Sequence, residues 1–409
     1  MKRKKIELVA PAGSWAGLQT AIKYGADSVY FGVKDLNMRH SAENFDLLEL
    51  DKVMKLLHKN DRKGYLAINT IVYNDELNKV SRILKKAKKA EVDAVIAWDM
   101  AVLSIAKELG LRVHLSTQAS VSNFSAVKFY SSLGVKRIVL ARECSFEAIK
   151  DIIKSIRKEK INCEIETFIH GAMCVSLSGR CFLSSYSFAK SANRGKCIQP
   201  CRRKYLITDL EEKGNKYILG KDYILSPKDL CTIDFIDKLI EIGVDSFKIE
   251  GRMRNPEYAK EVTSVYRTAI DAFFEGNLSA QLKKILKRKL SSVYNKGFTS
   301  GFFWKTPDDT GAGPVSSKYE KIFLGEVVNF YNKNNVAAIH IRNQGVKIGD
   351  RIAIYGKSTP LSIAEVKEMQ IGGKAVTFTE KGKQVGIKLP FKARRNDKVF
   401  FYKQKDTRS

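Results

Sequence analysis

The sequence predicts an α/β fold, in which a TIM-like (β/α)8 barrel carries a cysteine-rich insert after its seventh strand and precedes a small antiparallel β-barrel domain. Short apolar runs alternate with amphipathic helical stretches about eight times before residue 250, a pattern typical of parallel strands joined by helical crossovers. No GxGxxG motif follows the first run, which disfavours the alternative, an open doubly wound sheet. From Lys321 onward, short alternating strands are separated by Gly, Asn and Asp, as in small antiparallel barrels.

The repeating unit begins at the N-terminus. The run Ile6–Gly13 ends in a Pro/Gly turn, Ser14 provides an N-cap for the helix that follows, and Gly25 ends that helix. By the same reasoning, strands are expected over 6–13, 27–33, 64–72, 93–98, 112–116, 136–140, 163–169 and 245–249, and helices over 14–26, 51–60, 75–90, 100–109, 125–133, 145–158, 232–242 and 255–290. We therefore place the barrel at 1–305, a polar linker at 306–319 and the second domain at 320–409.

The chain is strongly basic. Lys and Arg number 72 against 44 Asp and Glu, a formal net charge of +28 that is spread along the whole sequence. Such an excess favours a polyanionic partner, RNA or DNA. The alternative is a Lys-rich solvated surface with no such partner.

We expect neither a leader peptide nor a membrane span. The N-terminus is basic but lacks an apolar run long enough for a signal peptide, and no later stretch is long enough to span a bilayer. We therefore expect a cytoplasmic location and no membrane partner. In a reducing cytosol, clustered cysteines are metal ligands or redox groups more often than disulfides.

The chemistry is expected in the segment from Glu164 to Cys201, where a buried strand runs into a polar loop. Four of the seven cysteines lie here, and a fifth, Cys231, follows, so that the cysteine-rich region spans about 164–231. In a (β/α)8 barrel, the carboxyl ends of the strands carry the active site. The spacing matches neither a zinc ribbon nor a ferredoxin, so an all-thiolate zinc site and a [4Fe–4S] cluster both remain open. Cys144 and Cys163 are expected to be buried and structural.

Two residues of the preceding strand are candidates for proton transfer. Glu166 and His170 are separated by an even number of residues, so strand alternation predicts that they face the same side. A carboxylate within reach of an imidazole orients it and raises its pKa, which suits acid–base catalysis.

A second group of candidates lies at other strand ends. The segment KIEGRMR lies at the end of the last expected barrel strand, and strand alternation places Lys248, Glu250 and Arg252 on one side. Guanidinium groups bind carboxylates in bidentate fashion, so we expect a carboxylate clamp here, with Arg142 as a second arm and Gln118 as a neutral hydrogen-bonding group. The alternative is an ion-pair network that closes the barrel.

These motifs resemble a known family. The segments ETFIHGAMCVSLSGRC, SANRGKCIQPCRRKY, SPKDLC and DSFKIEGRMR resemble the signature of peptidase family U-32, the collagenase-like family, over about the first three hundred residues. The resemblance implies relatives that hydroxylate the wobble uridine of tRNA, a cytidine of large-subunit ribosomal RNA or, as a pair, the ubiquinone ring. It also implies a [4Fe–4S] cluster on four cysteines, which map to Cys174, Cys181, Cys197 and Cys231, with Cys201 as an alternative to Cys197.

The resemblance therefore implies a function. The tRNA members take the hydroxyl oxygen from prephenate, and the length and the β-rich tail favour these members. We expect oxygen-independent, prephenate-dependent 5-hydroxylation of the wobble uridine, with tRNA, prephenate and a paralogous subunit as partners. The expected catalytic residues are Glu166, His170 and Glu250, and the expected substrate-binding residues are Arg142, Lys248, Arg252 and Gln118. Two alternatives remain: a metal-dependent peptidase, although no HExxH or GxSxG motif supports it, and a non-catalytic RNA-binding module with a structural zinc.

Overall fold

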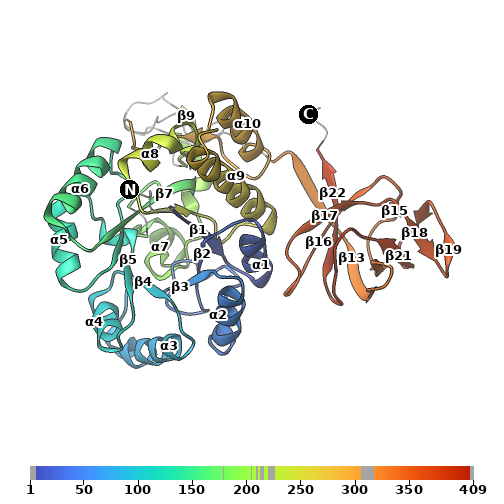
Figure 1. The fold of residues 1–409 in the computed structure, drawn as a ribbon, viewed down its shortest axis with the longest axis horizontal. Helices are drawn as coiled ribbons and strands as arrows, with labels where there is room; N and C mark the ends of the chain where they lie inside the picture. Colours follow the sequence, from blue (N-terminus) through green and yellow to red (C-terminus); the bar gives the residue numbers. More distant parts are fainter. Residues whose placement is uncertain are drawn as a thin grey trace.

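Within the described residues of the computed structural model, eight parallel strands close into a barrel (Figure 1). The structure describes residues 6–177, 179–203, 205–208, 211, 216–219, 226–304 and 317–405. The barrel strands are β1 (Glu7–Ala12), β2 (Ser28–Phe31), β3 (Lys63–Ala67), β4 (Ala94–Ala97), β5 (Val113–Leu115), β6 (Arg137–Val139), β7 (Glu164–Ala172) and β11 (Ser246–Ile249). Each pairs in parallel with the next, and β11 pairs with both β7 and β1. The predicted (β/α)8 barrel is confirmed.

Helices follow the strands and cover the outside of the barrel. They are α1 (Trp15–Lys23), α2 (Leu50–Lys59), α3 (Leu77–Lys89), α4 (Met100–Glu108), α5 (Phe124–Ser132), α6 (Phe146–Glu159), α8 (Ile236–Ile242) and α9 (Pro256–Phe274). Ser14 caps α1 as predicted, because its hydroxyl accepts a hydrogen bond from the N–H of Gly17 at 3.2 Å. The strands alternate between two apolar environments: Leu8 packs beneath the helices, whereas Val9 joins a cluster inside the barrel.

The expected helix over 255–290 is wrong in one respect, because it is two helices. After α9 the chain turns at Gly276, which has a φ of 77°, and a second helix, α10 (Ala280–Leu290), begins behind its N-cap Ser279. Glycine adopts this left-handed conformation without the steric cost that other residues incur. The run of apolar and basic residues continues across the break, so periodicity alone does not reveal it.

The insert after β7 holds the short helix α7 (Leu183–Phe188) and further strands. β8 (Tyr205–Thr208) pairs with β9 (Lys216–Leu219), and β10 (Asp229–Cys231) pairs antiparallel with β7. The sequence analysis did not anticipate β10, which also carries a two-residue strand, β12 (Phe298–Thr299), on its outer edge. The insert therefore returns to the barrel wall before α8 begins.

The second domain is an antiparallel sheet with its own apolar core, as predicted. Among residues 317–405 its strands are β13 (Tyr319–Tyr331), β14 (Val336–Ile341), β16 (Arg351–Tyr355), β17 (Ser362–Glu365), β18 (Met369–Ile371), β19 (Lys374–Ala375), β21 (Gln384–Lys388) and β22 (Lys398–Gln404), beside a separate pair, β15 (Val346–Lys347) and β20 (Phe378–Thr379). Most of the expected linker, 306–319, lies outside the described residues.

The second domain packs beside α1 and α9 (Figure 1). Leu361 donates its N–H to the hydroxyl of Thr20 at 3.1 Å, and the ammonium of Lys321 lies 3.0 Å from the carboxylate of Glu257 at the start of α9. In the part of the chain that the structure describes, no helix is long and apolar enough to cross a membrane.

Candidate active site

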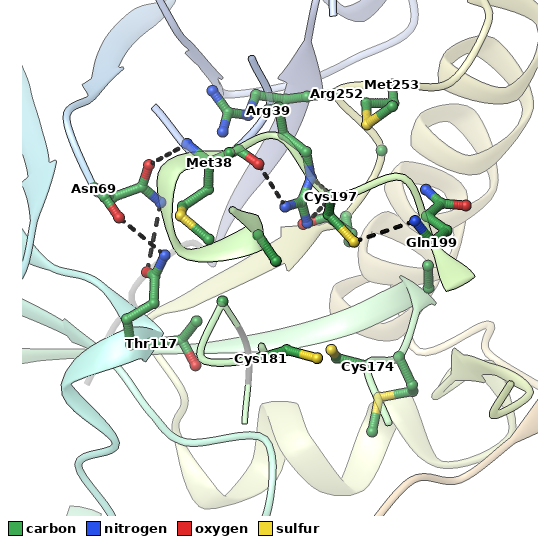
Figure 2. A pocket seen from close by; sticks show the side chains of 18 of the residues that line it. Met38, Arg39, Asn69, Thr117, Cys174, Cys181, Cys197, Gln199, Arg252 and Met253 are labelled. Atoms are coloured by element: carbon green, nitrogen blue, oxygen red, sulfur yellow. Dashed lines mark hydrogen bonds and ion pairs between the residues drawn. The ribbon is translucent and has the colours of Figure 1, made fainter. Parts of the chain in front are cut away.

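A pocket of about 360 Å³ opens at the carboxyl ends of the barrel strands. Its floor and walls come from residues at or just beyond these ends, among them Tyr30, Ala67, Ser116, Phe168 and Lys248. The segment from Cys174 to Cys201, called the cysteine loop below, covers the pocket from the other side (Figure 2). This is the position at which (β/α)8 barrels carry their ligands.

The cysteine loop is held against the opposite wall of the barrel. Arg194 forms an ion pair with Glu76 and lies over the ring of Tyr73 at 4.8 Å. Arg180 donates to the backbone carbonyl of Gln118 at 2.8 Å. Gly195, with a φ of 80°, passes so close to the backbone of the 37–38 segment that a side chain there would collide with it. The loop therefore has a defined position over the pocket.

Four thiols line this pocket, those of Cys174, Cys181, Cys197 and Cys201. Figure 2 shows three of them, Cys174, Cys181 and Cys197, turned toward the same space. Burial raises the pKa of the Cys201 thiol, Arg202 opposes the rise, and the nearby Cys174 and Cys197 add to it. The thiol of Cys201 therefore lies within electrostatic reach of two of the others.

Cys231, expected as the fourth ligand, lies elsewhere. It stands opposite His170 in the β10–β7 ladder and is buried, and its sulfur accepts a hydrogen bond from the hydroxyl of Tyr266 at 3.8 Å. Burial raises its pKa to about 11. The family resemblance, and not the spacing, assigned the fourth position to Cys231. In the structure Cys201 lines the pocket and Cys231 does not. Cys144 and Cys163 are buried, as expected.

The pocket thiols fit a tetrathiolate metal centre in donor type and number. No acidic residue lies between Thr167 and Thr208, so the negative charge of thiolates there is offset by the basic residues of the loop, which favours ligation. Within the described residues, no three His, Cys, Asp or Glu side chains lie close enough together to hold a metal ion. Ligation would therefore require the thiols to draw together.

The cationic wall of the pocket is built around one carboxylate, that of Glu250. Arg39 donates to its Oε1 through Nη2 at 3.0 Å and through Nε at 3.2 Å, and Arg142 Nη2 lies 3.7 Å from its Oε2. Burial raises the pKa of Glu250, but Arg39, Arg142 and Arg252 outweigh burial and hold it at about 2. Glu250 is therefore ionised at neutral pH.

Arg142 and Arg252 are buried, and the carboxylate of Glu250 compensates their charges only in part. Arg252 donates to the amide oxygen of Asn37 at 3.3 Å, and burial lowers its pKa to about 10. Arg142 donates through Nη1 to the backbone carbonyl of Ala172 at 2.6 Å and lies 4.0 Å over the ring of Phe168. Burial lowers its pKa, and its Nε has no hydrogen-bond partner among the described residues. Among the described residues that line the pocket, Glu250 is the only acidic one. The predicted group of Arg142, Lys248, Glu250 and Arg252 is thus brought together.

Arg39, which donates two hydrogen bonds to Glu250, was not predicted from the sequence. It lies in the loop that follows β2, eight residues after the strand ends. A search for polar residues directly after each strand does not reach that far. The signal that the sequence does contain is the polar segment NMRHS, in which Asn37 turns toward Arg252 and Arg39 toward Glu250.

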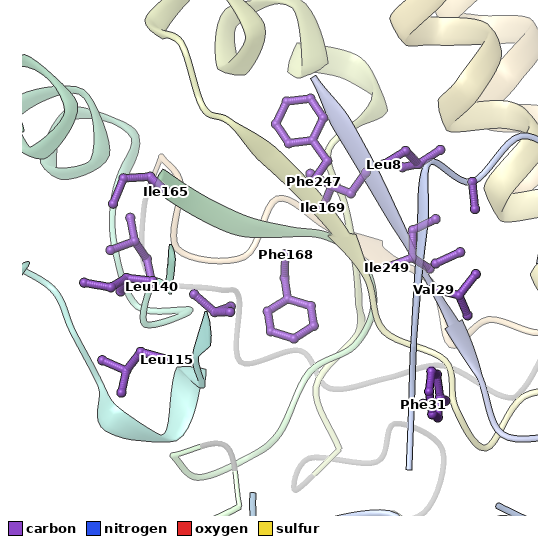
Figure 3. Packing of buried hydrophobic residues seen from close by; sticks show 14 of the residues in the cluster. Leu8, Val29, Phe31, Leu115, Leu140, Ile165, Phe168, Ile169, Phe247 and Ile249 are labelled. Carbon is purple, nitrogen blue, oxygen red and sulfur yellow. The ribbon is translucent and has the colours of Figure 1, made fainter. Parts of the chain in front are cut away.

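The expectation that Glu166 and His170 face one opening is wrong. Strand β7 carries a bulge, so Lys248 pairs with Phe168 whereas Ile249 pairs with His170. The bulge reverses the alternation beyond residue 168. Figure 3 shows the two sides of β7 at this point: Phe168 points away from Ile169 and from Phe247, which pack on the outer side of the sheet.

His170 consequently lies behind the barrel wall. Its ring packs against Tyr258, Tyr266 and Phe298, at centroid distances of 6.0, 5.5 and 5.6 Å. Burial lowers the pKa of His170 to about 3, so the ring is neutral at physiological pH and does not line the pocket.

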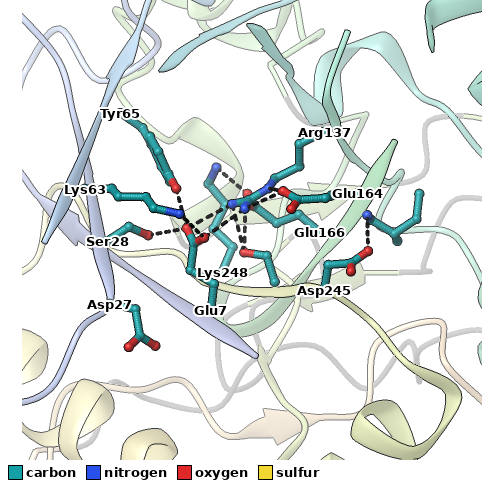
Figure 4. A network of polar contacts seen from close by, with 12 residues as sticks. Glu7, Asp27, Ser28, Lys63, Tyr65, Arg137, Glu164, Glu166, Asp245 and Lys248 are labelled. Atoms are coloured by element: carbon teal, nitrogen blue, oxygen red, sulfur yellow. Dashed lines mark hydrogen bonds and ion pairs between the residues drawn. The ribbon is translucent and has the colours of Figure 1, made fainter. Parts of the chain in front are cut away.

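Glu166 lies beneath the pocket, in a network of buried charges (Figure 4). Its carboxylate accepts from Lys248 Nζ at 2.8 Å, from Ser246 Oγ at 2.9 Å and from Arg137 Nη1 at 3.2 Å. Lys248 lines the pocket, whereas Glu166 positions Lys248 from below.

The remaining wall is polar and neutral. Gln118 donates to the backbone carbonyl of Asn69 at 3.1 Å, and its side-chain oxygen accepts from the amide of Asn69 at 3.4 Å and from the hydroxyl of Ser116. Both amides line the pocket beside Thr117, so Gln118 lies where the sequence analysis expected it.

The fold and this site define a (β/α)8-barrel protein with a cationic pocket covered by a cysteine loop. Residues 13–312 match the sequence profile described as Peptidase family U32, and the chain belongs to this family, which confirms the resemblance.

Three relatives show the range of the family. The chain is 46% identical to a protein of Methanocaldococcus jannaschii described as an uncharacterized protease, over 98% of both chains. It is 36% identical to a protein of Porphyromonas gingivalis named collagenase, over 99% of this chain and 100% of that one. It is also 36% identical to tRNA hydroxylation protein P1 of Bacillus subtilis, over 86% of this chain and 84% of that one.

Proposed function

We propose that this protein is an RNA-modifying enzyme that hydroxylates C5 of the wobble uridine in tRNA without O2, with prephenate as the source of the oxygen. A relative named for tRNA hydroxylation aligns over most of both chains, and a net charge of +28 favours a polyanionic substrate. The observation that carries the proposal is the excess of buried guanidinium groups in the pocket.

That excess fits a small dicarboxylate. Lys248 is paired with Glu166, and the single carboxylate of Glu250 is shared by Arg39 and Arg142. The charges of Arg142 and Arg252, the two buried arginines of the pocket, are therefore balanced only in part, and a ligand can neutralise them. Burying a charge is costly unless it is paired, and guanidinium groups bind carboxylates in bidentate fashion. Prephenate carries two carboxylates, one for each of these two groups.

The neutral wall suits the base. Amide groups such as those of Gln118 and Asn69 offer both donors and acceptors, which match the edge of a pyrimidine. Glu250, ionised because its pKa is about 2, is placed to accept a proton or to stabilise positive charge. His170 has no part in this proposal, because it does not reach the pocket.

Replacing the C5 hydrogen by a hydroxyl taken from prephenate releases one proton and two electrons from the base, so the reaction needs an external electron acceptor. A [4Fe–4S] cluster, when bound, would pass the two electrons to that acceptor one at a time. Cys174, Cys181 and Cys197 would hold it, with Cys201 or Cys231 as the fourth ligand. Zinc on the same thiols is the alternative, since both groups accept four thiolates.

The cofactor is tested by anaerobic reconstitution followed by iron, sulfide and zinc counts. Cys174→Ser, Cys181→Ser and Cys197→Ser are expected to lose iron, and Cys144→Ser, which changes a buried thiol outside the pocket, is the matched control. Iron loss in Cys201→Ser or in Cys231→Ser identifies the fourth ligand. Stoichiometric zinc without iron would contradict the cluster.

The function is tested by incubating the reconstituted protein with unmodified tRNA, prephenate and an added electron acceptor without O2, and analysing the nucleosides by mass spectrometry. We expect 5-hydroxyuridine that depends on prephenate and is absent with Arg252→Met. The absence of product, together with cleavage of gelatin by the same preparation, would favour a peptidase. In the described part of the pocket, no histidine lies beside a cysteine or serine to support that chemistry.

A further inference from the structure

The outer face of the cysteine loop is unusually apolar. Phe182 and Tyr186 are 59% and 85% exposed, and their ring centroids lie 5.9 Å apart. Phe182 is the N-cap residue of α7 and Tyr186 lies four residues later within the helix, so the two rings lie on the same side of it. The intervening Leu183 and Ser184 line the pocket. A single helical turn thus separates an exposed pair of rings from the candidate active site.

Exposed apolar residues are concentrated in this loop. Of the eighteen large apolar side chains that are exposed in the described part of the chain, six lie within the 24 residues from 175 to 198: Val175, Leu177, Phe182, Tyr186, Phe188 and Ile198. Large apolar side chains scattered singly over a surface need no explanation, whereas a local concentration of them marks a binding site.

The charge around these rings identifies the kind of partner. No acidic residue lies from Thr167 to Thr208, while Lys190, Lys196 and Arg203 are exposed. The guanidinium of Arg203 lies 4.3 Å from the ring centroid of Phe188. Exposed rings beside cations are the features that bind single-stranded nucleic acid, because bases stack on the rings and phosphates pair with the cations.

We propose that Phe182 and Tyr186 form a stacking platform for the unpaired bases that flank the target base of the RNA substrate. The inference rests on the RNA substrate proposed above and adds the site that positions it. Bases stacked on this platform would lie one helical turn from the pocket, so the neighbouring base could enter the pocket while its flanking bases stay stacked outside.

The test measures binding and stacking without turnover. An RNA hairpin with 2-aminopurine in its unpaired loop is titrated with the full-length protein over a series of salt concentrations. Stacking of a base on an aromatic ring is worth about tenfold in affinity, so we expect Phe182→Ala/Tyr186→Ala to weaken binding about a hundredfold and to abolish the quenching of 2-aminopurine. The salt dependence should keep its slope, because no phosphate contact is lost.

Three variants sharpen the result. Phe129→Ala is the matched control, because Phe129 is 58% exposed on α5, and it should bind normally. Phe182→Trp/Tyr186→Phe should restore quenching, because the rings are kept. Arg203→Ala should instead reduce the salt slope by about one.

Unchanged affinity and quenching in Phe182→Ala/Tyr186→Ala would overturn the platform, as would a wild-type dimer in sedimentation that this variant dissociates, because the rings would then form a protein interface. If Phe182→Ala/Tyr186→Ala binds RNA normally and hydroxylates tRNA, the stacking platform is rejected and the proposed reaction stands. If RNA binding depends on the two rings but the wild-type protein does not hydroxylate tRNA, the stacking platform is supported and the proposed reaction is rejected.

Discussion

Arg137 begins the barrel strand β6, Arg142 follows three residues after that strand ends, and the two differ in how their charges are balanced. The side chains are 3% and 8% exposed. Arg137 donates to Glu7 at 2.9 Å, to Glu164 at 2.7 Å and to Glu166 at 3.2 Å (Figure 4). Arg142, in contrast, approaches the carboxylate of Glu250 at 3.7 Å and shares it with Arg39.

The pKa shifts reflect the same difference. Burial lowers the pKa of both guanidinium groups, but the carboxylates of Glu7 and Glu166 reverse the effect at Arg137 and raise its pKa. At Arg142 burial prevails. At the lower end of the barrel, a buried guanidinium with a full set of carboxylate partners stabilises the fold. In the pocket, a buried guanidinium without a full set can bind a carboxylate of a ligand. The comparison separates a structural network from a ligand pocket.

The largest effect is expected on stability at the lower end. Replacing one partner of a buried ion pair costs about 3–5 kcal/mol, because the other charges stay buried and unpaired. Arg137→Met should therefore lower the free energy of unfolding by about this amount, measured by urea denaturation. Arg112→Met, which removes a half-exposed partner of Glu164, is the control and should cost less than about 1 kcal/mol. An equal loss in the two variants would contradict the structural role.

The pocket should respond in the opposite way. Arg252→Met removes a buried cation whose charge is incompletely compensated, so the free energy of unfolding should stay the same or rise. Prephenate affinity, measured by calorimetry, should fall about a hundredfold, because a buried charge pair is worth about 2–5 kcal/mol to binding. If Arg252→Met is as unstable as Arg137→Met and binds prephenate with unchanged affinity, Arg252 stabilises the fold and does not bind the ligand.

The smallest effect concerns pH and the residue excluded from the pocket. Because the pKa of His170 is lowered from 6.5 to about 3, the unfolded chain binds more protons between these values, and stability falls as the pH falls through this window. His170→Gln should reduce that slope by about 1 kcal/mol per pH unit, measured by urea denaturation from pH 3.5 to 7. Any prephenate-dependent activity above pH 7 should keep its pH profile. A changed pH profile of the activity above pH 7 would indicate that His170 takes part in the reaction.

The sequence predicted the barrel and much of the site because both depend on local pattern. The strand–helix alternation placed Arg142, Lys248, Glu250 and Arg252 at strand ends, and closure of the barrel brings these ends together. His170 was misplaced because a bulge reverses the alternation, and a bulge depends on pairing with β11. Arg39 was missed because a long loop separates it from its strand.

The cysteines show the same limit. Four thiols in one loop could be recognised as a group, but the choice between Cys201 and Cys231 depends on the long-range pairing of β10 with β7. That pairing buries Cys231 against Tyr266, and nothing in the spacing of the cysteines encodes it.

The central claim is that two buried guanidinium groups make the pocket selective for a dicarboxylate. Calorimetric titration with prephenate and with phenylpyruvate, which carries one carboxylate, tests it most directly. We expect the wild-type protein to bind prephenate about a hundredfold more tightly than phenylpyruvate, and Arg252→Met to lose that preference while still binding phenylpyruvate. Equal affinities for the two acids in the wild-type protein would contradict the account.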